Sequence, residues 1–125
     1  MPDKFEKYKK YWDDKFKEYE EAREVKFKEL SSLAEDLADY MYSNYNVDRV
    51  YLFGSLLDKN QFRSDSDIDL ATIGLDLGLL YDVSSKLAVL SGANKVDLVV
   101  LENCADYIKN KIIKGGKLIA RKKRY

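Results

Sequence analysis

Histidine is absent from the 125-residue sequence, and cysteine occurs once. Without histidine the chain cannot form a Ser-His-Asp or Cys-His catalytic group, or a histidine-ligated zinc site. The single cysteine, Cys104, cannot form an intramolecular disulfide, which agrees with a reducing compartment. Any catalysis must therefore use carboxylates, lysines, tyrosines and the metal ions that they recruit.

The sequence also lacks net charge and long apolar runs. Because 22 Lys and Arg residues balance 22 Asp and Glu residues, no bulk field favours a membrane or nucleic acid as a partner. No apolar run approaches the roughly 20 residues of a membrane-spanning helix, and the N-terminal MPDKFEKYKK has no signal-peptide core. We therefore expect a cytoplasmic protein with one domain, or one domain and an extension.

Residues 3–29 are densely charged, with many opposite charges four residues apart and few helix breakers. This pattern predicts a helix, and a stripe of aromatic residues marks one of its faces: Phe5, Tyr8, Trp12, Phe16 and Tyr19. The stripe is expected to pack within the chain; docking on a partner is the alternative.

Residues 32–35, SLAE, fit a capping box, so we expect a break or kink near Ser31 and then a second helix. One continuous helix is the less favoured alternative.

The periodicity changes after residue 46. Strands are expected in RVYLFG (49–54), DIDLATIG (67–74) and KVDLVVL (95–101). Helices are expected in LLYDVSSKLAVLSG (79–92) and in ADYIKNKIIKGGKLI (105–119), whose glycines end it, before a basic tail, ARKKRY. This order predicts an α/β (α+β) fold in which helices flank a small mixed β-sheet. We expect this domain at residues 30–125, with a charged amphipathic helical extension at residues 1–29.

Three aspartates on the expected strands point to a metal site. Asp67 and Asp69 lie two residues apart, so a strand places them on one face, roughly 7 Å apart at Cα. There they can converge on one or two divalent cations, and oxygen ligands favour Mg²⁺ or Mn²⁺. Asp97 stands in an apolar strand, where a lone carboxylate is costly unless it is paired or bound to metal. It is expected to act as a third ligand or general base; a structural ion pair is the alternative.

Gly54-Ser55 stands where the first strand ends. Because glycine has no Cβ, the backbone and the serine hydroxyl can approach a polyphosphate closely there. Arg63 precedes the acidic residues and either contacts the phosphates or forms a surface salt bridge. A phosphate cradle beside an acidic metal site makes up the two halves of a phosphoryl-transfer centre.

The Gly-Ser pair followed by RSDSDIDL resembles the nucleotidyltransferase superfamily of DNA polymerase β in its minimal form (MNT), over about residues 30–120. Within it, the sequence is most similar to the MntA-type antitoxins paired with HEPN-domain (HepT-type) toxins. The resemblance implies transfer of AMP from ATP to a tyrosine of the toxin. It also implies that Gly54 and Ser55 hold the triphosphate, that Asp67 and Asp69 bind two metals, and that Asp97 activates the attacking hydroxyl.

Two departures from the family pattern stand in the loop. Eleven residues, not ten, separate Ser55 from Asp67, and Leu56-Leu57-Asp58 occupies a position where arginine is frequent. The main alternative to a nucleotidyltransferase site is a calcium-binding loop. In it, Asp65, Asp67 and Asp69 would take the first ligand positions and Asp76 the last. However, Leu70 stands where such a loop requires glycine, so Asp65 is expected to be a solvated turn residue.

We therefore expect a Mg²⁺-dependent nucleotidyltransferase that uses ATP and acts as an antitoxin on a protein partner. One alternative is a non-catalytic module that neutralises the toxin by contact; another is a nucleotidyltransferase for a small molecule. The N-terminal helix could also form a homodimer contact, and Tyr125 is a conceivable site of self-modification.

Overall fold

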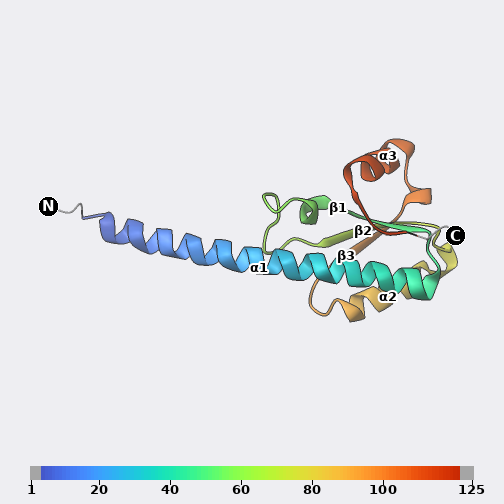
Figure 1. Cartoon of the computed structure of the whole chain (residues 1–125), viewed down its shortest axis with the longest axis horizontal. Helices are drawn as coiled ribbons and strands as arrows, with labels where there is room; N and C mark the ends of the chain where they lie inside the picture. Colours follow the sequence, from blue (N-terminus) through green and yellow to red (C-terminus); the bar gives the residue numbers. More distant parts are fainter. Residues whose placement is uncertain (1–3, 122–125) are drawn as a thin grey trace.

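A computed structural model describes residues 4–121 (Figure 1). Its order is α1 (Glu6–Tyr45), β1 (Arg49–Phe53), η1 (Gly54–Leu57), β2 (Ile68–Ile73), η2 (Leu77–Leu79), α2 (Leu80–Leu90), β3 (Val96–Val100), η3 (Leu101–Asn103), α3 (Asp106–Gly115) and β4 (Lys117–Arg121). The α-helices and strands together form the mixed α+β fold that the sequence predicts.

The four strands form one mixed sheet in the order β3-β2-β1-β4. β1 pairs antiparallel with both β2 and β4, whereas β2 pairs parallel with β3. A parallel pair needs a crossover connection, and α2 supplies it between β2 and β3. The predicted strands are therefore neighbours in the sheet, so residues far apart in the sequence meet on adjacent strands.

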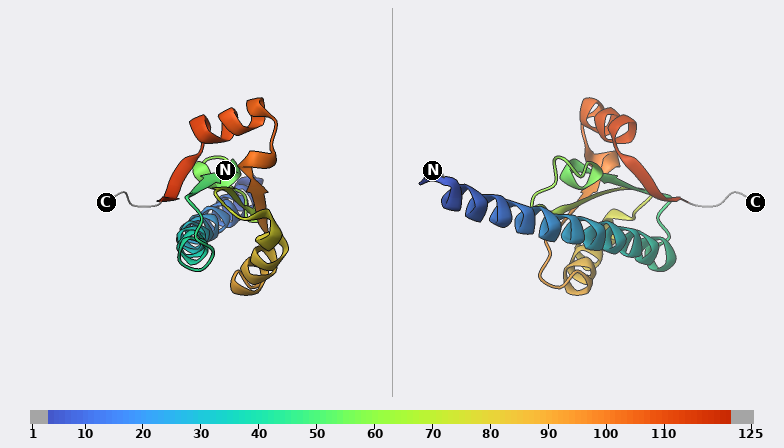
Figure 2. Two further views of the ribbon diagram at one scale, coloured as in Figure 1. Left: turned by 90° about the vertical axis from the view of Figure 1, so that its right-hand side faces the viewer. Right: turned by 60° about the vertical axis from the view of Figure 1, so that its left-hand side comes forward.

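Helices cover both faces of the sheet, as Figures 1 and 2 show. Alternate strand residues point to opposite faces. Val50, Leu52, Ile68 and Leu70 pack with α1 and α2 in the larger core, whereas Tyr51 and Ala71 pack with Ile112 of α3 in the smaller one. No helix within residues 4–121 is long and apolar enough to cross a membrane.

The expected break near Ser31 is wrong, because α1 runs through it without interruption. Leu30 and Ala34, on either side of the two serines, are 2% and 0% exposed against the sheet. One continuous helix buries both residues, and this packing outweighs the local capping signal.

The N-terminal half of α1 projects beyond the sheet (Figure 1). Its aromatic stripe is exposed: Phe5 59%, Tyr8 54%, Trp12 67%, Phe16 66% and Tyr19 47%. The prediction that the stripe packs within the chain is therefore wrong for this structure.

The sequence pattern predicts a helix at residues 105–119 and then a basic tail, and it does not predict the strand β4. The helix α3 ends at Gly115, and Lys117–Arg121 then forms an edge strand beside β1. Only Ile119 and Ala120 of β4 are partly buried, and cations stand at both of its ends. Charged ends are common on edge strands, but they hide the apolar alternation by which strands are recognised. Most of the basic tail, including Tyr125, lies outside the described residues.

Candidate active site

Asp69 and Asp97 lie side by side on neighbouring strands. They are direct partners in the parallel register of β2 and β3, and adjacent strands are separated by about 4.8 Å. Their neighbours Ala71 and Val99, two residues further along each strand, belong to the smaller core. Both carboxylates therefore point to the α3 face of the sheet, at the end where β2 and β3 begin.

Asp67 and a lysine complete this acidic patch. The Nζ atom of Lys95 lies 3.8 Å from Asp67 Oδ2 and 3.9 Å from Asp97 Oδ1. The patch is open to solvent, since the side chains of Asp67 and Asp97 are 36% and 48% exposed. Lys95 was missed in the sequence, although it stands two residues before Asp97 and so shares its strand face.

The close approach of the acids changes the chemistry of Asp69. Its burial, the charges of Asp97 and Asp67, and a hydrogen bond to Asp97 raise the pKa of Asp69 to about 6, and Lys95 opposes the rise. The patch thus carries more negative charge than one lysine balances, and it offers only oxygen donors. Such a donor set fits Mg²⁺ or Mn²⁺.

The side chains do not already have the geometry of a metal site. Within residues 4–121, no three or more His, Cys, Asp or Glu side chains are arranged to hold a metal ion. The fit of Mg²⁺ or Mn²⁺ to this patch therefore rests on its oxygen donors and on the position of Lys95. The ammonium group of Lys95, itself a cation, stands between the carboxylates of Asp67 and Asp97.

Gly54 lies directly against this patch. Its φ of +79° is unfavourable for other residues, and a Cβ atom placed on it would lie 2.2 Å from Asp69 Oδ2. The register explains the contact, because Phe53 is the partner of Asp69 across β1 and β2. The Gly54-Ser55 turn and the acidic patch, predicted as two halves of one site, are thus brought together.

Arg63 stands in the loop between η1 and β2, and its side chain is exposed. Its backbone N–H donates to Ser66 Oγ at 2.9 Å, which shapes the turn just before Asp67. Asp65 is exposed in the same turn. The contact of Arg63 with phosphates and the absence of a ligand role for Asp65 both stay predictions.

The helix α1 holds this loop in place. The Nη1 atom of Arg23 donates to the carbonyl oxygens of Lys59 at 2.5 Å and Phe62 at 2.9 Å. Lys26 Nζ donates to the carbonyl oxygen of Ser64 at 2.5 Å. One signal in the sequence points to this role: Arg23 is a charged residue that follows the aromatic stripe on the same face of α1. The helix therefore positions the segment that leads into the acidic patch.

Arg23→Met should loosen the loop without unfolding the domain, because methionine keeps the apolar stem and loses both bonds to the loop carbonyls. We expect amide hydrogen exchange in residues 58–66 to become roughly tenfold faster. Lys15→Met is the matched control, since Lys15 pairs with the exposed Glu18 at 3.7 Å on the projecting part of α1. Equal exchange rates in the two variants would show that Arg23 does not hold the loop.

Comparisons with known proteins cover the part of the chain that carries this site. Residues 35–125 match the family model described as polymerase beta, nucleotidyltransferase, a range that contains the acidic patch and the Gly54-Ser55 turn. A candidate protein adenylyltransferase of Methanocaldococcus jannaschii is 36% identical over 70 residues, which are 56% of this chain. Because they are 52% of the relative, the chain spans about half of that protein's length.

Solved structures show the same fold. A chain in a crystal structure of a toxin–antitoxin with AMP-PNP matches with a TM-score of 0.58 and 25% identity, over 70% of this chain and 73% of that chain. A chain of the toxin–antitoxin MntA–HepT matches with a TM-score of 0.56 and 23% identity, over 74% and 73%. The sheet and the helices that carry the acidic patch therefore have solved counterparts.

Proposed function

Because this chain belongs to the polymerase beta nucleotidyltransferase family, we propose that it transfers AMP from ATP to a hydroxyl group, expected to be a tyrosine, of a HEPN-type toxin. In this role it acts as an antitoxin in the cytoplasm. The observation that carries the proposal is the contact of Gly54 with Asp69, which joins the Gly-Ser turn to the acidic patch. The similarity to a candidate protein adenylyltransferase supports AMP as the group transferred.

Asp67 and Asp69, with Asp97 as a further ligand, would hold two Mg²⁺ ions, with Mn²⁺ as an alternative. Ions held there supply charge neutralisation at the phosphates of ATP. Gly54 and Ser55 would lie along the triphosphate, and Arg63 would reach the phosphates from the loop that α1 holds.

Asp97 is assigned as the general base. It is more exposed than Asp67, at 48% against 36% for the side chains, so an incoming hydroxyl group can reach it. The acceptor oxygen attacks the α-phosphorus of ATP, Asp97 takes the hydroxyl proton, and pyrophosphate leaves with the electrons of the broken P–O bond.

A protein acceptor fits the shape of the site better than a small molecule. The acidic patch lies at an open end of the sheet. A hollow of about 270 Å³ exists near η1, but it lies against α1 and β4 and contains none of the proposed site residues. A partner that presents its own hydroxyl group would close the open side. In this arrangement residues 30–125 form the catalytic domain and residues 1–29 form an extension.

The test is incubation with ATP, Mg²⁺ and the protein encoded by the neighbouring gene, read by intact mass. The partner should gain one or more AMP units with the unaltered chain and with Asp65→Asn, which changes an exposed acid in the same loop. It should gain none with Asp67→Asn. Neutralisation of the partner without any change of mass would refute AMP transfer and favour inhibition by contact.

A further inference from the structure

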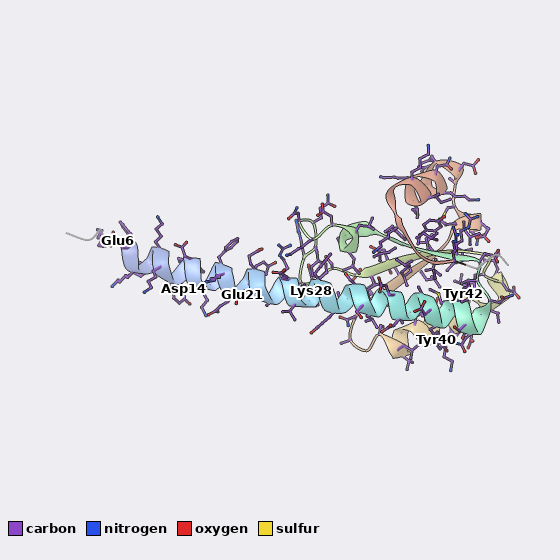
Figure 3. The ribbon with its side chains drawn as sticks, viewed as in Figure 1. Glu6, Asp14, Glu21, Lys28, Tyr40 and Tyr42 are labelled. Atoms are coloured by element: carbon purple, nitrogen blue, oxygen red, sulfur yellow. The ribbon has the colours of Figure 1, made fainter. Side chains whose placement is uncertain are left out.

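The exposed aromatic stripe continues the packed face of α1. Steps of three and four residues lead from Phe5 to Tyr19, then to Arg23, and on to the buried Leu30 and Ala34. Such steps keep all these side chains on one face of the helix. In Figure 3, Glu6 and Asp14 mark the part of α1 that projects beyond the sheet. The same face is therefore covered by the domain at one end and left open at the other.

The open part is large enough for a stable interface. An aromatic side chain offers about 200 Å² of contact surface, and the five residues of the stripe are 47% to 67% exposed. Together they present about 600 Å², which is at the upper end of what a monomer ordinarily leaves in one apolar patch. A standard interface buries about 800 Å² per partner, so the aromatic residues alone supply most of it.

We infer that this surface is covered by the same surface of a second copy of the chain, with the two helices antiparallel. The spacing of the stripe carries the argument: its steps are three, four, four and three, and they read the same from either end. With a two-fold axis at Trp12, every residue of the stripe faces another: Trp12 faces its own copy, Phe5 faces Tyr19, and Tyr8 faces Phe16. A two-fold interface requires such self-complementarity.

The charges on the helix favour the same orientation. Residues 4–10 carry four lysines and one glutamate, a net charge of +3, whereas residues 13–21 carry five carboxylates and two lysines, a net charge of −3. Antiparallel pairing brings the basic end of each helix beside the acidic segment of the other. Parallel pairing would set like charges side by side.

The shape of the chain permits this pairing. Phe5 to Tyr19 spans about 21 Å of helix, and in Figure 1 this part of α1 lies beyond the sheet and the other helices. The two domains would therefore lie at opposite ends of the paired helices.

Sedimentation equilibrium of the full chain tests the dimer without any nucleotide, so its outcome is independent of the proposed function. The unaltered chain should have twice the mass of 14.5 kDa. Trp12→Glu should weaken association more than about 100-fold, since both copies lose their central contact, with an unchanged circular dichroism spectrum. Tyr81→Glu is the control, because Tyr81 is 86% exposed on α2, away from the stripe, and this variant should stay dimeric.

Disulfide crosslinking tests the orientation in a Cys104→Ser background. Phe5→Cys and Tyr19→Cys should crosslink after the two variants are mixed and allowed to exchange, and neither should crosslink alone. A parallel pair would give the opposite result. Three results overturn the inference: a monomer at every concentration, a dimer that Trp12→Glu leaves intact, or self-crosslinking of Phe5→Cys.

Discussion

Asp69→Asn is expected to reduce nucleotidyl transfer by about 100- to 1000-fold and, at the same time, to stabilise the metal-free protein. Asp69 stands between Asp97 on β3 and Gly54 on η1, so it touches both halves of the proposed site. Asparagine keeps the shape of the side chain but removes the charge that holds a divalent cation. Losses of this size are known for single groups that stabilise charge in a transition state.

The gain in stability follows from the pKa of Asp69. The pKa is about 6 in the folded chain and about 3.8 ordinarily, because burial and the neighbouring acids disfavour the charged form. The folded state therefore holds the proton more tightly, and the free energy of unfolding falls as pH rises from about 4 to about 6. Allowing for solvent screening, the loss is about 1 kcal/mol, and asparagine removes it.

Urea unfolding in EDTA between pH 4 and pH 7 measures this effect. The unaltered chain should lose stability over that range, and Asp69→Asn should lose less and be the more stable of the two at pH 7. Mg²⁺ should restore stability to the unaltered chain but not to Asp69→Asn. Asp65→Asn should behave like the unaltered chain, because Asp65 is exposed in the preceding turn. If Asp69→Asn were less stable than the unaltered chain at pH 7, the charge of Asp69 would not destabilise the folded protein, and this explanation would be wrong.

Gly54→Ala is expected to lose transfer activity and about 1 to 3 kcal/mol of stability. Two costs combine here: the backbone φ of +79°, and a Cβ atom that would lie 2.2 Å from Asp69 Oδ2. The carboxylate has to move, and it would then leave the position from which it serves the site.

Gly92→Ala separates these two costs. Gly92 has a φ of +65°, but a Cβ atom there would meet nothing within 4 Å. It should therefore lose only the stability due to φ and keep full activity. Urea unfolding and a transfer assay on both variants make the comparison. Equal stability losses, or an active Gly54→Ala, would show that the contact with Asp69 is unimportant.

The acidic patch was predictable from the sequence because each of its aspartates can be recognised from the few residues around it. Two aspartates two residues apart in an extended segment share a face, although Asp67 itself precedes β2 by one residue. A lone aspartate in an apolar strand demands a partner. Once β2 and β3 pair, Asp69 and Asp97 fall in register. The roles of these residues stay predictions, whereas their proximity is a property of the fold.

The features that the sequence did not reveal depend on distant packing. The capping signal at residues 32–35 was outweighed because Leu30, before it, and Ala34, within it, are both buried against the sheet. The strand β4 has too little alternation to be recognised alone, and it is defined by its pairing with β1. Arg23 reaches the loop only because α1 crosses it at that point.

Calorimetric titration with AMP-PNP, in the presence and absence of Mg²⁺, is the most direct test that the Gly54-Ser55 turn and the three aspartates form one nucleotide site. Binding should require Mg²⁺, persist in Asp65→Asn and disappear in Asp69→Asn. Binding of equal strength without Mg²⁺, or undiminished in Asp69→Asn, would contradict the account.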